Sequence, residues 1–316
     1  MLNRVLVSLV FLAALSGCAY QTSLDLYLKG QLAAEQGRLP AALAALSAAI
    51  KENPRMGEAY VARASILQQQ GNAEAAATDY EQAVKLEPYN FTANFQLGVI
   101  YQQLKKFAQA VAVYQRAVEI RPLDTQANMN LALSFMQMGQ PIQGLYYAQR
   151  AVQGDPNSAT ANANLGVMYA QTQYHSAAID SFKRAIELDS RQPEVYLNLG
   201  QEYFSTGSYE QARNVLETAR SLAPAERVSE RLGATYFRLQ QYDKAQEAFT
   251  EALRMSSKDT AALNGLGATL MTRALLAPAA NVETAKSALF FWNQSLQLDK
   301  NQPVIQNLVN QYTPHE

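Results

Sequence analysis

Small residues recur along this chain at an almost constant spacing, and that spacing limits what the chain can fold into. Glycine or alanine returns every 34 residues, with a single step of 33, at Gly30, Ala64, Gly98, Ala132, Gly166, Gly200, Gly233 and Gly267. Two further series, through Ala178 and Ala185, keep the same register. A segment of this length holds two helices, and one helical hairpin cannot bury both of its apolar faces alone. The copies must therefore stack on one another.

Residues 159–190 illustrate the pattern inside one repeat. Leu165 and Tyr169 lie on one face of a first helix, and Phe182 and Ala185 lie on one face of a second. Proline marks the helix ends, because it lacks the amide hydrogen and clashes with the preceding turn. These prolines are Pro54, Pro88, Pro122, Pro156 and Pro224.

This 34-residue helix–turn–helix period resembles the tetratricopeptide repeat family. The resemblance implies an all-α fold: a right-handed α-solenoid of about eight repeats over residues 23–300, closed by a capping helix and tail in residues 301–316. It also implies a scaffold for protein–protein interaction.

Residues 1–17 have the pattern of a bacterial lipoprotein signal peptide. A weakly positive start precedes the apolar run 5–15, which is too short to span a membrane as a helix. The run ends in Leu15-Ser16-Gly17-Cys18, which resembles a lipobox. The resemblance implies cleavage before Cys18 and lipidation of its sulfur.

Residues 18–22 would then be the lipidated anchor and a short linker, which places the repeats close to a membrane. Acyl chains anchor a protein because each buried methylene contributes about 0.8 kcal/mol. By resemblance to Gram-negative lipoproteins, Ala19 after the cysteine implies the outer membrane, facing the periplasm. The alternative is an ordinary signal peptide in which Cys18 is a buried cysteine. Cys18 is the only cysteine, so the chain has no internal disulfide.

Composition and motifs argue against several functions. The formal net charge of -1 predicts no basic surface for nucleic acid. The two histidines, His175 and His315, lie in an inter-helix turn and at the chain end, away from any metal-ligand spacing. We found no phosphate loop or nucleophile arrangement either. We therefore expect no enzyme activity, no cofactor, no bound metal and no small-molecule substrate.

Carboxamide side chains form the one constellation that indicates binding. Two residues before the small residue of the first helix, four consecutive repeats have Gln96, Asn130, Asn164 and Asn198. A carboxamide can donate to and accept from the same peptide unit. The row resembles the asparagine ladder in the repeats of O-linked GlcNAc transferases, which implies a concave groove that holds peptide backbone. The alternative is that these residues only solvate the groove.

Repeat seven has Arg231 in this position, with Arg227 one turn earlier. The pair resembles half of the carboxylate clamp of chaperone-binding repeats. Thr160 stands where that clamp has a further basic residue two repeats earlier.

The last repeat has nine extra residues between Gly267 and Ala288, which places them between its two helices, and residues 272–278 predict a prolonged first helix that ends at Pro278. They either form a hook for a partner or are a tolerated loop insertion. Trp292 is expected in the core, and residues 303–312 are expected to form the closing helix.

A lipobox followed by such repeats resembles the pilotin-like lipoproteins of type IV and Flp pilus assembly. The leading hypothesis is a lipid-anchored adaptor that binds extended segments of envelope proteins. It would act in assembling an outer-membrane machine such as a pilus or secretin. An adaptor for peptidoglycan hydrolases and an accessory part of a glycosyltransferase complex are the alternatives.

Overall fold

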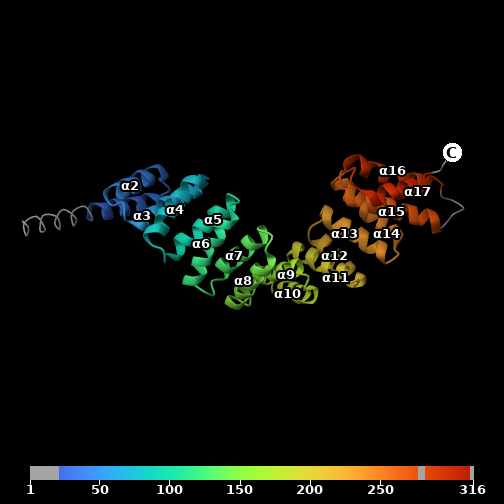
Figure 1. Cartoon of the computed structure of the whole chain (residues 1–316), viewed down its shortest axis with the longest axis horizontal. Helices are drawn as coiled ribbons and strands as arrows, with labels where there is room; N and C mark the ends of the chain where they lie inside the picture. The colour runs from blue at the N-terminus through green and yellow to red at the C-terminus, as the bar shows by residue number, and fades with distance from the viewer. Residues whose placement is uncertain (1–20, 277–281, 314–316) are drawn as a thin grey trace, which may run out of the picture. The chain divides into compact units, whose positions relative to one another are not determined.

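The computed structural model describes residues 21–276 and 282–313 of the 316-residue chain. Within these residues the chain is helical apart from short turns and contains no strand, which confirms the all-α prediction. The chain divides into two compact units (Figure 1), which we call unit 1, up to Pro156, and unit 2, from Asn157 onward. The predicted signal peptide and Cys18 lie outside the described residues.

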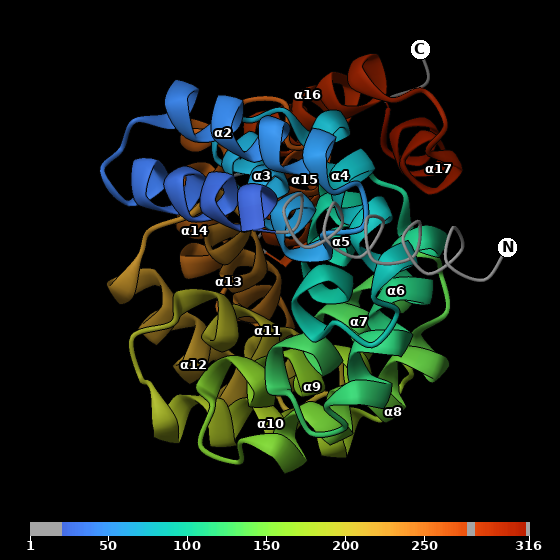
Figure 2. The same cartoon turned by 90° about the vertical axis from the view of Figure 1, so that its left-hand side faces the viewer.

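Each unit contains four helical hairpins (Figures 1 and 2). Those of unit 1 are residues 21–35 with α2 (Leu39–Glu52), α3 (Gly57–Gln69) with α4 (Ala73–Leu86), α5 (Phe91–Gln103) with α6 (Phe107–Ile120), and α7 (Thr125–Gln137) with α8 (Pro141–Gly154). Those of unit 2 are α9 (Ala159–Gln171) with α10 (His175–Leu188), α11 (Pro193–Ser205) with α12 (Tyr209–Leu222), α13 (Glu226–Arg238) with α14 (Tyr242–Met255), and α15 (Thr260–Leu276) with α16 (Val282–Leu298). The chain closes with α17 (Pro303–Tyr312).

We call the first helix of each hairpin the A helix and the second the B helix. Within each unit, a B helix packs against its own A helix and against the A helix of the next repeat. Successive A helices also touch, as α3 does with α5 and α11 with α13. They form one continuous face in each unit, which we call the A-helix face.

The turn between A and B helices has the same conformation in every repeat from the first to the seventh. One residue adopts a positive φ, a conformation in which glycine is the least strained residue. The residues with this conformation are Gly37, Gly71, Gly139 and Gly207, with Lys105, Gln173 and Gln240 at the corresponding places. Glycine therefore occupies this place in four of the seven turns.

Side-chain caps and prolines mark where the helices begin. Asn90, Asp124 and Ser158 each accept a hydrogen bond from the backbone amide three residues later, at 3.0, 2.9 and 3.1 Å respectively. These bonds satisfy amides that have no partner in the first turn of a helix. Pro141 is the first residue of α8, a position where its missing amide costs nothing.

The small residues of the 34-residue series face the largest side chains of the B helices. A Cβ added to Gly98 would lie 2.5 Å from the Tyr114 ring, and one added to Gly267 would lie 2.5 Å from the Trp292 ring. At these two positions, backbone and aromatic ring thus pack in direct contact, which leaves no room for a side chain. Trp292 is 2% exposed, which confirms its predicted place in the core.

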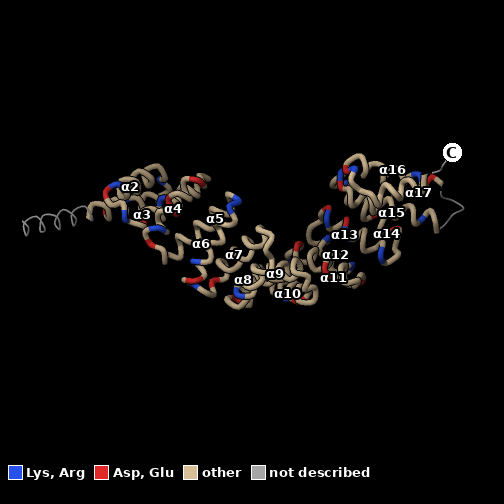
Figure 3. Tube along the Cα trace, viewed as in Figure 1, with Lys and Arg blue, Asp and Glu red and all other residues tan. Residues whose placement is uncertain are grey.

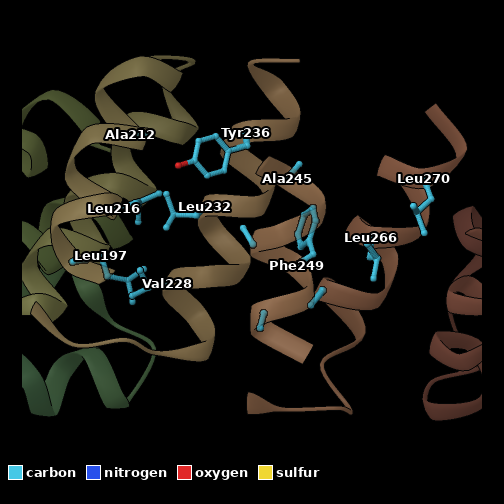
Figure 4. Packing of buried hydrophobic residues seen from close by; sticks show 14 of the residues in the cluster. Leu197, Ala212, Leu216, Val228, Leu232, Tyr236, Ala245, Phe249, Leu266 and Leu270 are labelled. Carbon is cyan, nitrogen blue, oxygen red and sulfur yellow. The ribbon is translucent and has the colours of Figure 1, made fainter. Parts of the chain in front are cut away.

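Apolar side chains from neighbouring repeats interlock along unit 2 (Figure 4). The cluster includes Leu216 of α12, Leu232 of α13, Phe249 of α14 and Leu266 of α15. Each hairpin therefore covers the apolar side of the next, as stacked repeats require.

The last repeat confirms its prolonged first helix and corrects one prediction. The nine extra residues do not lie only between the two helices, because α16 is lengthened as well as α15. Both α15 and α16 have 17 residues, whereas the A and B helices of the preceding repeats, from α3 to α14, have 13 and 14. Arg273, in the added part of α15, forms an ion pair with Asp243 at 3.0 Å. The extension is thereby bound to the preceding repeat.

The closing helix α17 lies where it was predicted. Ile305, Leu308 and Val309 pack against the core of unit 2, and the rings of Tyr312 and Trp292 are 6.3 Å apart. Val304, in the first turn of this helix, is 69% exposed.

Candidate peptide-binding site

The predicted carboxamides all lie on A helices. In unit 1, Gln96 is in α5 and Asn130 is in α7; in unit 2, Asn164 is in α9 and Asn198 is in α11. All four are partly exposed, with intermediate burial. Each unit thus presents two carboxamides from consecutive A helices, and we describe the two pairs separately.

A second asparagine series, which the sequence analysis missed, lies two residues earlier in the same helices. Asn94 and Asn128 are fully buried. Each donates two hydrogen bonds from its Nδ2 to carbonyls of the preceding turn, including those of Pro88 and Pro122 at 3.0 and 3.1 Å. These asparagines hold successive repeats together. Their 34-residue spacing could have revealed this series in the sequence. It reflects a structural role of these asparagines rather than a binding role.

Asn130 lies beside a buried hydrogen-bond network in unit 1. Its backbone carbonyl oxygen accepts a hydrogen bond from Gln102 Nε2 at 3.0 Å and another from the Ser134 hydroxyl at 2.8 Å. Gln102 Oε1 in turn accepts from the Tyr114 hydroxyl at 2.8 Å. Burial raises the pKa of Tyr114, while a hydrogen bond with the Asn130 side chain opposes the rise. The network keeps the backbone of α7 rigid where Asn130 is exposed.

A cavity of about 400 Å³ opens beside Gln96 on the A-helix face of unit 1. Its walls include Gln31 from the first helix, Ala62 and Ile66 from α3, and Tyr80 from α4. The sequence analysis did not find it, although Ala62 occupies the carboxamide position of its own repeat.

The A-helix face of unit 2 carries charge around the predicted clamp residues. Arg231 Nε lies 3.3 Å from Glu230 Oε2, so this guanidinium already has an acidic neighbour. Burial raises the pKa of Glu230, and the nearby Arg231 charge opposes the rise. Arg227 is exposed, as is Thr160 on α9.

His175 has a structural contact rather than a free side chain. It is the first residue of α10, and its Nδ1 lies 2.7 Å from Oε2 of the buried Glu202 in α11. Among the described residues, no group of three or more His, Cys, Asp or Glu could hold a metal ion. None of the described helices combines the length and apolar composition needed to cross a membrane.

Comparison with family models identifies the class of protein. Tetratricopeptide repeat models match residues 27–80, 61–125, 129–193, 169–231 and 227–259. The chain belongs to the tetratricopeptide repeat family. Comparison with curated proteins gives no significant match.

Several solved structures share the fold. YrrB, described as a TPR protein with an unusual peptide-binding site, is 24% identical with a TM-score of 0.54, over 60% of this chain and 96% of its own. MamA is 26% identical with a TM-score of 0.50, over 53% of this chain and 92% of its own. Pseudomonas aeruginosa pilF is 20% identical with a TM-score of 0.59, over 70% of this chain and 97% of its own. The fold is therefore that of a repeat scaffold for protein–protein interaction.

Proposed function

We propose that this protein is a lipid-anchored adaptor that holds extended segments of envelope proteins on its A-helix faces. The observation that carries the proposal is the row of half-buried carboxamides on consecutive A helices: Gln96 and Asn130 in unit 1, and Asn164 and Asn198 in unit 2. A carboxamide pairs with both polar groups of a peptide unit, so such a row grips backbone without reading side chains.

The rigid support of these side chains favours binding over simple solvation. Asn130 projects from a helix whose backbone is held by Gln102 and Ser134. Asn164 lies two residues from Asn162, which donates from Nδ2 to the Ser158 carbonyl at 2.9 Å. A side chain on a fixed backbone loses less conformational entropy when it binds.

Removing the carboxamides tests this part of the proposal. The variant Asn130→Ala, Asn164→Ala, Asn198→Ala is expected to fold normally and to capture much less partner in cross-linking of whole cells. The matched control removes three exposed carboxamides from B helices, Gln82→Ala, Gln109→Ala and Gln143→Ala, and is expected to capture partner normally. Equal capture by both variants would show that the carboxamides do not form the binding site.

The membrane anchor is proposed from the Leu15-Ser16-Gly17-Cys18 sequence. In the repeat register, residues 19–22 separate Cys18 from the first repeat, so the anchor would hold the repeats close to the membrane. Mass spectrometry of the mature protein should find acyl chains on Cys18, and Cys18→Ser should move the protein from the detergent phase to the aqueous phase. An unmodified thiol at the mature terminus would contradict the anchor.

We further propose that the assembled structure is a pilus or secretin of the outer membrane. The support is the combination of a lipobox with a tetratricopeptide array, which resembles pilotin-like lipoproteins. The likeness to pilF concerns the fold. Deletion of the gene is expected to abolish piliation. Normal pili with altered cell-wall turnover would instead indicate the hydrolase adaptor, and sugar transfer by the purified complex would indicate the glycosyltransferase accessory.

A further inference from the structure

The A-helix face of unit 1 contains a cavity whose chemistry differs from the rest of the carboxamide row. It has a volume of about 400 Å³, within the range of small ligand sites. Its walls come from the first three repeats, with Gln31 and Gln96 on opposite sides and Ala62 between them. None of the described residues that line it is charged.

The cavity exists because the carboxamide position of repeat two holds alanine. The corresponding residue is Gln96 in repeat three and Asn130 in repeat four. Ala62 has a single methyl group where those repeats have a long polar side chain, so the space between the first helix and α5 stays open. The Gln96 carboxamide at the edge of the cavity suits the backbone of a bound segment, and the cavity beside it suits one side chain of the same segment.

The lining of the cavity is electrically neutral and combines apolar side chains with the uncharged polar side chains of Gln31, Ser65, Gln69, Thr92 and Gln96. Leu46 is fully buried and Ile66 is 4% exposed. Burial raises the pKa of Tyr80 to about 12, so its phenol is uncharged at physiological pH. The nearest cation on α3, Arg63, does not line the cavity: its two hydrogen bonds to Asp79, each 2.7 Å long, hold it against α4.

We propose that this cavity binds an uncharged aliphatic side chain (leucine, isoleucine or valine) of an extended segment whose backbone pairs with Gln96. The inference deepens the proposed function and rests on it. A charged side chain entering this cavity would lose its hydration without gaining a counter-charge. Leu28 and Leu32 of the first helix are 54% and 52% exposed and extend the uncharged surface toward the start of unit 1.

The distance between neighbouring A helices allows one bound segment to reach both Gln96 and the cavity at Ala62. Packed helices lie about 8–10 Å apart, and an extended chain advances about 3.3 Å per residue. A segment that pairs with Gln96 therefore places a residue about three positions away over Ala62.

The test selects a phage-displayed library of random dodecapeptides on the full lipoprotein in detergent. Selected peptides are expected to share one aliphatic residue flanked by uncharged residues. The best of them, made synthetically and followed by fluorescence anisotropy, should bind Ala62→Leu at least tenfold more weakly, because the added side chain fills the cavity. The matched control Ala44→Leu, on the exposed side of α2, should bind as tightly as the natural protein. Circular dichroism establishes that both variants fold.

The outcomes separate this inference from the proposed function. Selected peptides with a shared charged residue, or unchanged binding to Ala62→Leu, would overturn the cavity assignment. If the cavity assignment failed but peptides bound more weakly to the Asn130→Ala, Asn164→Ala, Asn198→Ala variant, the proposed adaptor function would be supported without the cavity. Weak binding to Ala62→Leu together with normal binding to the triple variant would support the cavity and not the carboxamide row. Recovery of no peptide would overturn both.

Discussion

The same interior position is filled by different chemistry in the middle repeats of unit 1 and in the first three repeats of unit 2. In the second and third repeats of unit 1, Tyr80 and Tyr114 occupy it, and their hydroxyls donate to Gln68 and Gln102 of the A helix at 3.4 and 2.8 Å. In unit 2, the position holds Phe182, Leu216 and Phe249, and Ala170, Phe204 and Phe237 stand where the glutamines were. A buried hydroxyl is tolerated where its partner is also present. Where the partner is absent, the position is a hydrocarbon.

The A helices also differ in charge from repeat to repeat (Figure 3). In unit 1, α5 and α7 contain no charged residue, and neither does α9 of unit 2, whereas α13 of unit 2 contains five. Packing constrains the buried side of an A helix and leaves the other side free to vary. Two units with one backbone pattern can therefore bind different segments.

The largest effect is expected at the end of unit 2, where Trp292 fills the interior position that Ala148 fills in unit 1. Trp292→Ala should destabilise unit 2 by about 3–5 kcal/mol, since a large ring leaves a cavity. Hydrogen exchange should accelerate in α16 and in α17, which packs on this ring through Tyr312.

Phe290→Ala is the control for that variant, because Phe290 is on the same helix and 57% exposed. It should change stability by about 1 kcal/mol or less. Equal losses in the two variants would mean that α17 does not depend on the Trp292 core.

Exchanging tyrosine and phenylalanine at the interior position tests directly whether each unit depends on its own kind of side chain there. Phe182→Tyr should cost about 1–3 kcal/mol, because the new hydroxyl has no carboxamide at Ala170 to accept its hydrogen bond. Tyr114→Phe should cost about 1–2 kcal/mol, because Gln102 loses its donor. Urea unfolding measures both.

Adding the missing partner sharpens this prediction. Ala170→Gln combined with Phe182→Tyr should recover part of the stability that Phe182→Tyr loses. A double variant no more stable than Phe182→Tyr would show that the tyrosine–glutamine pairs of unit 1 are not a transferable solution.

The turns provide a smaller test. Gln173 and Gln240 of unit 2 have φ values of 66° and 60°, whereas unit 1 has glycine at this place in all repeats but the third. Gln173→Gly should stabilise unit 2 by about 0.5–1 kcal/mol. Glycine adopts the positive φ without the steric strain that glutamine has there, and this gain exceeds the larger backbone entropy that glycine loses on folding. Thermal unfolding measures the change, and Gly71→Ala in unit 1 should shift stability the other way.

The smallest effect concerns pH and the charged A helix of unit 2. Burial raises the pKa of Glu230 above its ordinary 4.5, so the folded chain holds this proton more tightly than the unfolded chain does. Stability should therefore fall as pH rises from 4.5 through the raised pKa. Glu230→Gln should remove this fall, as measured by urea midpoints across that range. Glu247→Gln, at an exposed site on α14, should leave it in place.

Much of the fold could be predicted because the repeat is local. The Gly98 and Gly267 positions, the Pro141 helix start and the closing helix follow from spacing and from backbone chemistry that acts within a few residues. In the last repeat, residues 272–278 predicted the prolonged α15. The lengthening of α16 was missed, because spacing counts extra residues without showing that they continue the helical hydrogen bonding.

The candidate site was predictable only in part. The register placed Gln96, Asn130, Asn164 and Asn198 on the A helices, where each is partly exposed. The cavity beside Ala62 could not be predicted, because its walls come from three repeats and its volume depends on side chains that are distant in sequence.

The amino-acid sequence alone determined that this protein is an array of helical hairpins, since a 34-residue period of small and aromatic residues can bury its apolar surface only by stacking. Tertiary structure alone decided the two compact units, the tyrosine–glutamine pairs of unit 1 and the uncharged cavity in its A-helix face. The physical reason is range: a helix is specified by neighbours along the chain, whereas a cavity or a buried hydrogen bond is specified by whichever side chains the stacked repeats bring together.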